Sequence, residues 1–269
     1  MRVGPECRLA AENLFRSRVL LWTMTRRELS ARYAGSMAGM LWAFAQPLLM
    51  MASYILVFDV VFAMRVGESL SSQRAGVYLV AGMLPWLGFS ESLSRASSSL
   101  LDAGSLLQKN ALPPVLFVTR SVLASWVVFA PLMLLLMVAY GSMNGPSWPY
   151  AVLPALVILQ GLLALLLGFC LAILAAAMRD VLQILGFGLS VGIFLSPVLF
   201  PVQMFPEDWR WVLYLNPMSA LIESYQAILL HGQWPEARLW FISAMWVLGL
   251  AVLLERLLAN SREELMDWL

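Results

Sequence analysis

Long apolar stretches constrain the fold of this chain more than any other feature of its sequence. A helix needs about 20 apolar residues to cross the hydrocarbon core of a membrane, and such stretches lie at residues 38–64, 77–101, 115–140, 150–177, 182–204 and 239–258. Of the 269 residues, 61% are hydrophobic and 12% are charged, which is about half the charged share of a soluble domain. The sequence therefore predicts an all-α membrane protein with six transmembrane helices.

Basic residues predict the orientation of these spans, because loops that stay in the cytoplasm are enriched in Lys and Arg. With six spans and a cytoplasmic N-terminus, the outer loops carry four of the 17 basic residues, which are Arg65, Arg74, Arg210 and Arg238. The remaining thirteen fall on the inner side. Both termini are therefore expected in the cytoplasm.

Residues 1–36 form a less apolar segment ahead of the membrane domain at residues 37–269, and they include seven arginines. At 100° per residue, one helical face of this segment collects its large apolar and aromatic side chains while Arg16 and Arg27 lie opposite. The residues on that face are Phe15, Val19, Trp22, Leu29 and Tyr33. This pattern predicts an amphipathic helix that lies along the membrane surface.

The connection between the fifth and sixth spans is the longest, at residues 205–238, and it is rich in proline and aromatic residues. Residues 218–230 within it are apolar but too few to cross a membrane. Short re-entrant helices are expected there.

Polar side chains interrupt the first two spans. Residues of this kind at membrane depth normally face the bundle interior or a water-filled cavity, so we expect a wet translocation path. The predicted path residues on the first span are Trp42, Gln46 and Ser53, which share one arc, and those on the second span are Trp86, Ser90, Glu91, Ser94 and Ser98. Phe194 and Phe200 are predicted to line the outer end of the path. Two simpler readings compete: the second span ends near Ser90 and a loop follows, or the rings of the first span only pack against lipid and other helices.

No residue set in the sequence supports catalysis or metal binding. Gly188 and Gly192 frame a GxSxG match, but it lies in an apolar stretch where close helix packing explains it better. The chain has one histidine, His231, and two cysteines, Cys7 and Cys170, without metal-ligand spacing. A phosphate-binding loop is absent, and a net charge of +1 offers no basic face for nucleic acid. We therefore expect no enzyme, no catalytic residue and no bound cofactor or metal.

Four stretches resemble, in the same order, the permease subunits of type-2 ABC exporters of polysaccharides and polyol phosphates. They are residues 26–62 (RRELSARYAGSMAGMLWAFAQPLLMMASYILVFDVVF), 79–95 (LVAGMLPWLGFSESLSR), 178–187 (MRDVLQILGF) and 196–221 (SPVLFPVQMFPEDWRWVLYLNPMSAL). The spacing of the first stretch and the pair Arg179–Asp180 resemble the O-antigen branch more than the capsule branch. From the residues alone, that pair fits a structural ion pair, a helix-end anchor or part of a partner surface.

The resemblance implies a transporter subunit of the bacterial inner membrane that pairs with a second copy and with two separate ATPase subunits, which bind ATP and Mg²⁺. Its cargo would be an undecaprenyl-diphosphate-linked polysaccharide such as O-antigen. The alternatives are a capsule or teichoic-acid exporter, or a type-2 exporter of a small molecule. Residues implied at the ATPase are Arg26, Arg27, Glu28, Arg32, Tyr33, Lys109 and Asn110.

Overall fold

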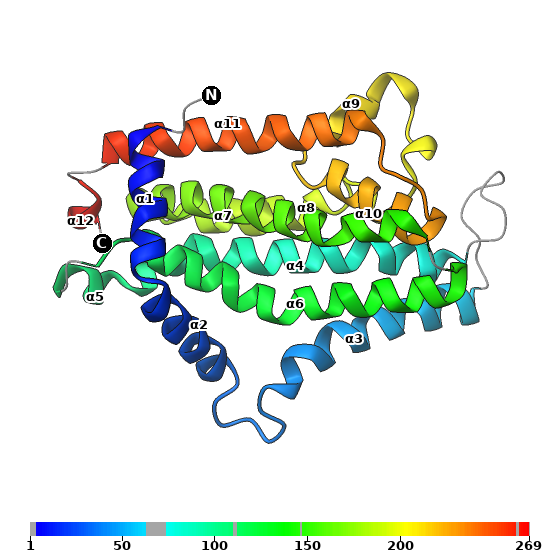
Figure 1. Ribbon diagram of the computed structural model, residues 1–269, viewed down its shortest axis with the longest axis horizontal. Helices are drawn as coiled ribbons and strands as arrows, with labels where there is room; N and C mark the ends of the chain where they lie inside the picture. Colours follow the sequence, from blue (N-terminus) through cyan, green and yellow to red (C-terminus); the bar gives the residue numbers. More distant parts are fainter. Residues whose placement is uncertain (1–3, 63–73, 110–111, 146, 262–263, 269) are drawn as a thin grey trace.

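The fold is a bundle of nearly parallel and antiparallel helices (Figure 1). The computed structural model describes residues 4–62, 74–109, 112–145, 147–261 and 264–268, and every regular element within these ranges is helical. Four long helices form the body: α4 (Ala75–Asp102), α6 (Val115–Asn144), α7 (Leu153–Ala177) and α11 (Ala237–Ser261). The all-α prediction is confirmed.

Helix α4 lies at the centre and packs against α6 and α7 over most of its length. Small residues allow this close approach, as is usual for helices in membranes. A Cβ atom added at Gly88 would lie 3.1 Å from the side chain of Phe129, and one added at Gly168 would lie 2.6 Å from the Cβ of Ala96. The amide of Gln160 on α7 also donates to the carbonyl of Pro85, 3.0 Å away. Helix α4 is therefore the central helix against which its neighbours pack.

Four stretches of the described residues are long and apolar enough to cross a membrane: Leu41–Val61, Val115–Met143, Trp148–Ala177 and Ala237–Ser261. The first joins α3 (Leu41–Ile55) to the π-helix η1 (Leu56–Val61), and the third joins the 3₁₀ helix η2 (Trp148–Val152) to α7. Helix α4 has 28 residues, but serines and charged residues occupy its second half. Four of the six expected spans are thus supported by length and composition.

The fifth expected span, residues 182–204, is not one helix. Helix α8 (Asp180–Gly192) has 13 residues and ends where Gly192 meets the ring of Trp86. Asn216 Nδ2 donates to the Gly192 carbonyl at 2.9 Å, which satisfies an acceptor that the helix end would leave open. Pro197 and Pro201, which lack an N–H group, follow within nine residues. The helix ends here because the side chain of Asn216, rather than a further helical turn, supplies the hydrogen bond to the Gly192 carbonyl.

Short helices fill the outer connection: η3 (Val202–Met204), η4 (Glu207–Trp209), α9 (Arg210–Leu213) and α10 (Ser219–His231). Helix α10 is mostly buried and packs against α4, α6, α7 and α11, although its 13 residues are too few for a span. It ends at Gly232, whose φ of 59° lies in the left-handed region that favours glycine.

The N-terminal segment forms two helices, α1 (Pro5–Arg16) and α2 (Arg18–Arg32), that meet at Ser17. Helix α1 crosses one end of the bundle, near α5 (Gly104–Lys109) and α12 (Leu265–Trp268) (Figure 1). The carboxylate of Glu255 on α11 accepts the backbone N–H groups of Glu6 at 3.0 Å and Cys7 at 2.8 Å. These donors have no partner inside α1, so Glu255 anchors the start of the chain to the last long helix.

The predicted amphipathic face is divided between two environments. Phe15, Val19 and Trp22 are exposed, whereas Leu29 is buried and Tyr33 is half-buried. The break at Ser17 and the packing of α2 on α6 explain this, because α2 buries the stripe Leu21, Thr25 and Leu29 instead. The exposed rings remain free to meet a membrane surface.

Candidate functional site

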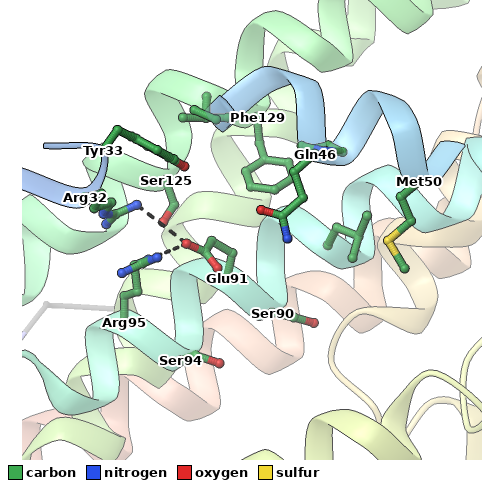
Figure 2. A pocket seen from close by; sticks show the side chains of 14 residues that line it. Arg32, Tyr33, Gln46, Met50, Ser90, Glu91, Ser94, Arg95, Ser125 and Phe129 are labelled. Carbon is green, nitrogen blue, oxygen red and sulfur yellow. Dashed lines mark hydrogen bonds and ion pairs between the residues drawn. The ribbon is translucent and has the colours of Figure 1, made fainter. Parts of the chain in front are cut away.

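A cavity of about 370 Å³ lies where α2, α3, α4 and α6 meet (Figure 2). Its apolar lining includes Met50, Leu87 and Val128. Its polar and aromatic lining consists of Arg32, Tyr33, Gln46, Ser90, Glu91, Ser94, Arg95, Ser125 and Phe129. The cavity therefore combines charged groups, hydroxyls, an amide and two rings.

Helical spacing explains which residues reach this space. Helix α3 buries Ala43 and Pro47 against the bundle, and Gln46 beside them points into the cavity (Figure 2). On α4, Ser90 and Glu91 lie one turn before Ser94 and Arg95, so all four project toward the same side. Helix α4 continues past Ser90 to Asp102, so the reading in which the helix ends there and a loop follows is wrong.

A network of ion pairs crosses the inner wall. Arg32 Nη2 lies 2.7 Å from Glu28 Oε1 on the same helix, and Arg32 Nη1 lies 3.6 Å from Glu91 Oε1 on α4. Glu91 Oε1 also accepts a hydrogen bond from Arg95 Nε. On the far side of α2, Arg120 Nε lies 3.2 Å from Glu28 Oε2. The Arg32 side chain is only 8% exposed. These ion pairs therefore hold α2 against α4 and α6 and do not lie on an open surface.

Several buried polar atoms at this site have no hydrogen-bond partner among the described residues. They are Ser90 Oγ, Ser125 Oγ and Arg32 Nε. More than nine in ten buried polar groups of folded proteins are paired, so three such atoms around one cavity mark unused binding capacity.

The structure brings together four of the predicted path residues, Gln46, Ser90, Glu91 and Ser94, at this one cavity. Trp42 and Ser53, on the same arc of α3 as Gln46, are exposed and do not line this cavity. Ser98 Oγ lies beyond the cavity and donates to Asp102 Oδ2 at 3.0 Å.

The other three of the four predicted aromatic residues lie elsewhere. Phe194 is exposed, and Phe200 stacks on Phe205 with ring centroids 6.0 Å apart. Trp86 is 5% exposed and packs near Phe89 and Gly192. Trp86 therefore lies outside the polar cavity, in the core beside the apolar groove between α4 and α8.

The residues implied at the ATPase fall into two groups. Glu28 and Arg32 turn inward, and Tyr33 lines the cavity. Arg26, Arg27 and Lys109 are exposed. Asn110 lies outside the described residues. Arg179 and Asp180 are both exposed, and no ion pair joins them in the described part of the chain, so a partner surface is the reading that their exposure favours.

Sequence reasoning missed Arg95, Arg120, Ser125 and Phe129. Arg95 follows Glu91 by four residues, a spacing that predicts an ion pair on a helix. Arg120 is a charge inside an expected span, which by itself indicates a functional or paired residue. Nothing in the sequence indicates that Ser125 and Phe129 on α6 would face α3.

Comparison with known proteins matches residues 19–230 to the family described as ABC-2 type transporter. The chain is 35% identical over 229 residues to the O-antigen export system permease protein RfbA of Myxococcus xanthus, covering 83% of this chain and 85% of that one. It is 24% identical to the protein of the same name in Klebsiella pneumoniae, covering 79% and 81% of the two chains. It is 22% identical to the polysialic acid transport protein KpsM of Escherichia coli, covering 89% and 92%.

These matches confirm the resemblance seen in the four sequence stretches, and they fit the long apolar helices. These relatives are named as permease or transport proteins and not as enzymes. The chain belongs to the ABC-2 type transporter family.

Proposed function

We propose that this chain is the transmembrane subunit of an ATP-driven exporter that moves a lipid-linked polysaccharide across the bacterial inner membrane. The relatives support this cargo, since two are named for O-antigen export and one for polysialic acid transport. O-antigen is the first choice because the 35% identity is to a permease of that name. Capsule polymers and teichoic acids are the nearest alternatives.

The observation that carries the proposal is the mixed chemistry of the cavity. A polymer must slide through many equivalent positions, so its contacts must be weak and repeated. Rings such as Tyr33 and Phe129 offer apolar faces to sugars, while Gln46 and the serines of α4 offer hydrogen bonds to hydroxyls. A polar, ring-bearing wall fits a hydrated sugar chain better than it fits a greasy small molecule.

The rest of the transporter follows from the same proposal. Helix α4, and α8 together with residues 193–201 that follow it, are the two further spans that make six, and α9 and α10 dip into the membrane from the outside without crossing it. Two copies pair with two ATPase subunits, which supply ATP and Mg²⁺. Helices α1, α5 and α12 lie at one end of the bundle (Figure 1). We assign that end to the cytoplasm because basic residues favour this side, and the exposed Arg26, Arg27 and Lys109 to the ATPase interface.

Polymer export in cells tests the proposal. Gln46→Leu should lower the amount of polysaccharide that reaches the cell surface, while the permease level and its copurification with the ATPase stay unchanged. Leu48→Ala is the matched control, because Leu48 is exposed on the same helix and does not line the cavity. Normal export in Gln46→Leu cells, measured by blotting surface polysaccharide, would remove the cavity from the path.

A small-molecule exporter is the second candidate, and one observation favours it. A groove of about 360 Å³ with almost entirely apolar walls lies between α4 and α8, lined by Trp86, Phe89, Leu189 and Leu215 among others. An apolar compound would bind there. Filling it with Gly188→Leu should then abolish export of the compound, whereas polysaccharide export requires the polar cavity.

A further inference from the structure

We propose that the charged end of the polar cavity is a binding site for a phosphate group, with Arg32 and Arg95 as its ligands and Glu91 as the resident anion that the phosphate displaces. This inference rests on the proposed function in one respect: the phosphate is assigned to the lipid that carries the polysaccharide. The site itself follows from the geometry of the described residues.

A single carboxylate oxygen holds the two arginines together. Glu91 Oε1 accepts from Arg95 Nε and lies 3.6 Å from Arg32 Nη1 (Figure 2). One oxygen is a poor match for two guanidinium groups, each of which carries five N–H donors. A phosphate presents several oxygens and pairs with arginine through two parallel hydrogen bonds. The same donors would therefore bind a phosphate more completely than they bind Glu91.

Donors remain free for such an anion. Arg32 Nε is buried without a partner, and so are the hydroxyls of Ser90 and Ser125, the latter on a side chain that is 1% exposed. Among the hydrogen bonds and ion pairs of the described residues, Arg95 uses only its Nε. A phosphate oxygen accepts from hydroxyls and guanidinium groups alike, so every unpaired donor here suits one ligand chemistry.

The charge balance also favours an anion. Arg32, Arg95 and Arg120 face two carboxylates, Glu28 and Glu91, within the connected network. One positive charge is left over. Because Arg32 is almost fully buried, water screens this excess less than it would at a surface.

The site is open to the cytoplasmic end of the cavity. The side chains of Glu91 and Arg95 are 37% and 41% exposed, and Ser94 between them in the wall is exposed too. A headgroup can therefore reach Arg95 first, and Arg32 only when Glu91 swings away. Displacement of Glu91 would also loosen α2 from α4, which links binding of the phosphate to the helix that leads to the ATPase.

Charged thiol reagents measure this site directly. The permease–ATPase complex in phosphatidylcholine nanodiscs, with Cys7 and Cys170 replaced, receives the single cysteine Ser94→Cys. Its rates with a sulfonate-bearing and a quaternary-ammonium-bearing methanethiosulfonate are each divided by the rate for free cysteine. We expect the anionic reagent to react faster, and inorganic pyrophosphate to slow it.

Two further variants distinguish an anion site from a structural cluster. Arg95→Gln should slow the anionic reagent about tenfold, the effect of one unit charge about 6 Å away at a dielectric constant between those of protein surface and water, and so lower the anion preference. Glu91→Gln should raise the anion preference and strengthen the protection by pyrophosphate, because the competing carboxylate is gone, whereas a purely structural ion pair would raise the preference by charge alone and give no pyrophosphate protection. Arg256→Gln, an exposed arginine at the same end of the bundle, is the control and should change nothing.

An unreactive Ser94→Cys, a preference for the cationic reagent, or an anion preference that falls in Glu91→Gln would each overturn the phosphate site. The lipid source is identified by nanodiscs that contain phosphatidylglycerol or undecaprenyl diphosphate: protection at the lower mole fraction marks the ligand. Polysaccharide export is scored separately. An anion site that Arg95→Gln weakens, together with normal export in that variant, would leave the site standing and remove its assignment to the exported lipid.

Discussion

Glu28 of α2 and Arg120 of α6 lie 3.2 Å apart, Oε2 to Nε, although 92 positions separate them in the sequence. Ser121 Oγ also donates to Glu28 Oε2 at 3.2 Å, and Arg32 holds its other oxygen. The N-terminal segment is thereby joined to the third expected span through one carboxylate. Motion of α2 and motion of the bundle are coupled at this point.

Removal of that carboxylate should destabilise the permease. Glu28→Ala leaves Arg120 and Arg32 without their shared partner, and the cost should be roughly 2 kcal/mol, between that of an exposed and a fully buried ion pair. Thermal unfolding of the purified protein measures it. The charge swap Glu28→Arg with Arg120→Glu should recover part of the loss, and a double variant no better than the worse single variant would contradict the pairing.

Gly161 should tolerate no side chain. A Cβ atom there would lie 1.3 Å from the ring of Trp126, which packs α6 onto α7. Gly161→Ala should cost about 1–3 kcal/mol, the usual range for overpacking, and Trp126→Leu in the same chain should relieve it. Gly186→Ala is the control, because no atom lies within 4 Å of its added Cβ. Equal unfolding temperatures for the two alanine variants would show that this contact is absent.

Protonation of Glu223 should stabilise the outer connection. Burial raises the pKa of Glu223 above its ordinary value of 4.5, although Tyr214 donates to it at 2.8 Å and Arg238 lies 3.8 Å away. A raised pKa in the folded state means that its stability contribution is complete below pH 4.5 and is lost as the pH rises through the folded value.

Glu223→Gln, which stays neutral, should therefore gain stability relative to the wild type as the pH rises from 4 to 8. Unfolding temperatures of both proteins across that range provide the test. A difference that is constant with pH, or one that grows toward acid, would contradict the raised pKa.

Topology reporters check the orientation. A reporter fused after Leu269 should be active in the cytoplasm, and one inserted after Asn144 should be active outside, because residues 141–149 carry no Lys or Arg. External activity of the C-terminal fusion would end the six-span arrangement.

The sequence was informative wherever one helix determines the result by itself. Hydrophobic length located α6, α7 and α11, and the spacing of Gln46, Ser90, Glu91 and Ser94 placed them on faces that meet at one cavity. Tyr54, Phe58 and Phe62 lie four residues apart in the sequence, and in the structure the centroids of neighbouring rings are 6.1 Å apart. Periodicity within a helix depends on the chain's own geometry, and so it can be predicted.

Contacts between helices could not be predicted in this way. Helix α8 stops at Gly192 because Asn216, 24 positions later, binds its last carbonyl. From the sequence, Arg32 is predicted to be a surface arginine of an amphipathic helix. In the structure it forms an ion pair with Glu91 of α4. Both outcomes depend on which neighbour supplies a hydrogen bond or a counter-charge, and no local pattern contains that information.

Photocrosslinking from the cavity tests the central claim, that polysaccharide passes along this wall. The photoreactive amino acid benzoylphenylalanine would replace Gln46, and in a separate strain Phe58, which stacks on Tyr54 away from the cavity. After irradiation of cells that are exporting, the Gln46 variant should carry a high-mass adduct that stains with a polysaccharide antibody and disappears when the ATPase is inactivated. The Phe58 variant should carry none. Equal adducts at both positions, or none at position 46 in cells that export normally, would contradict the account.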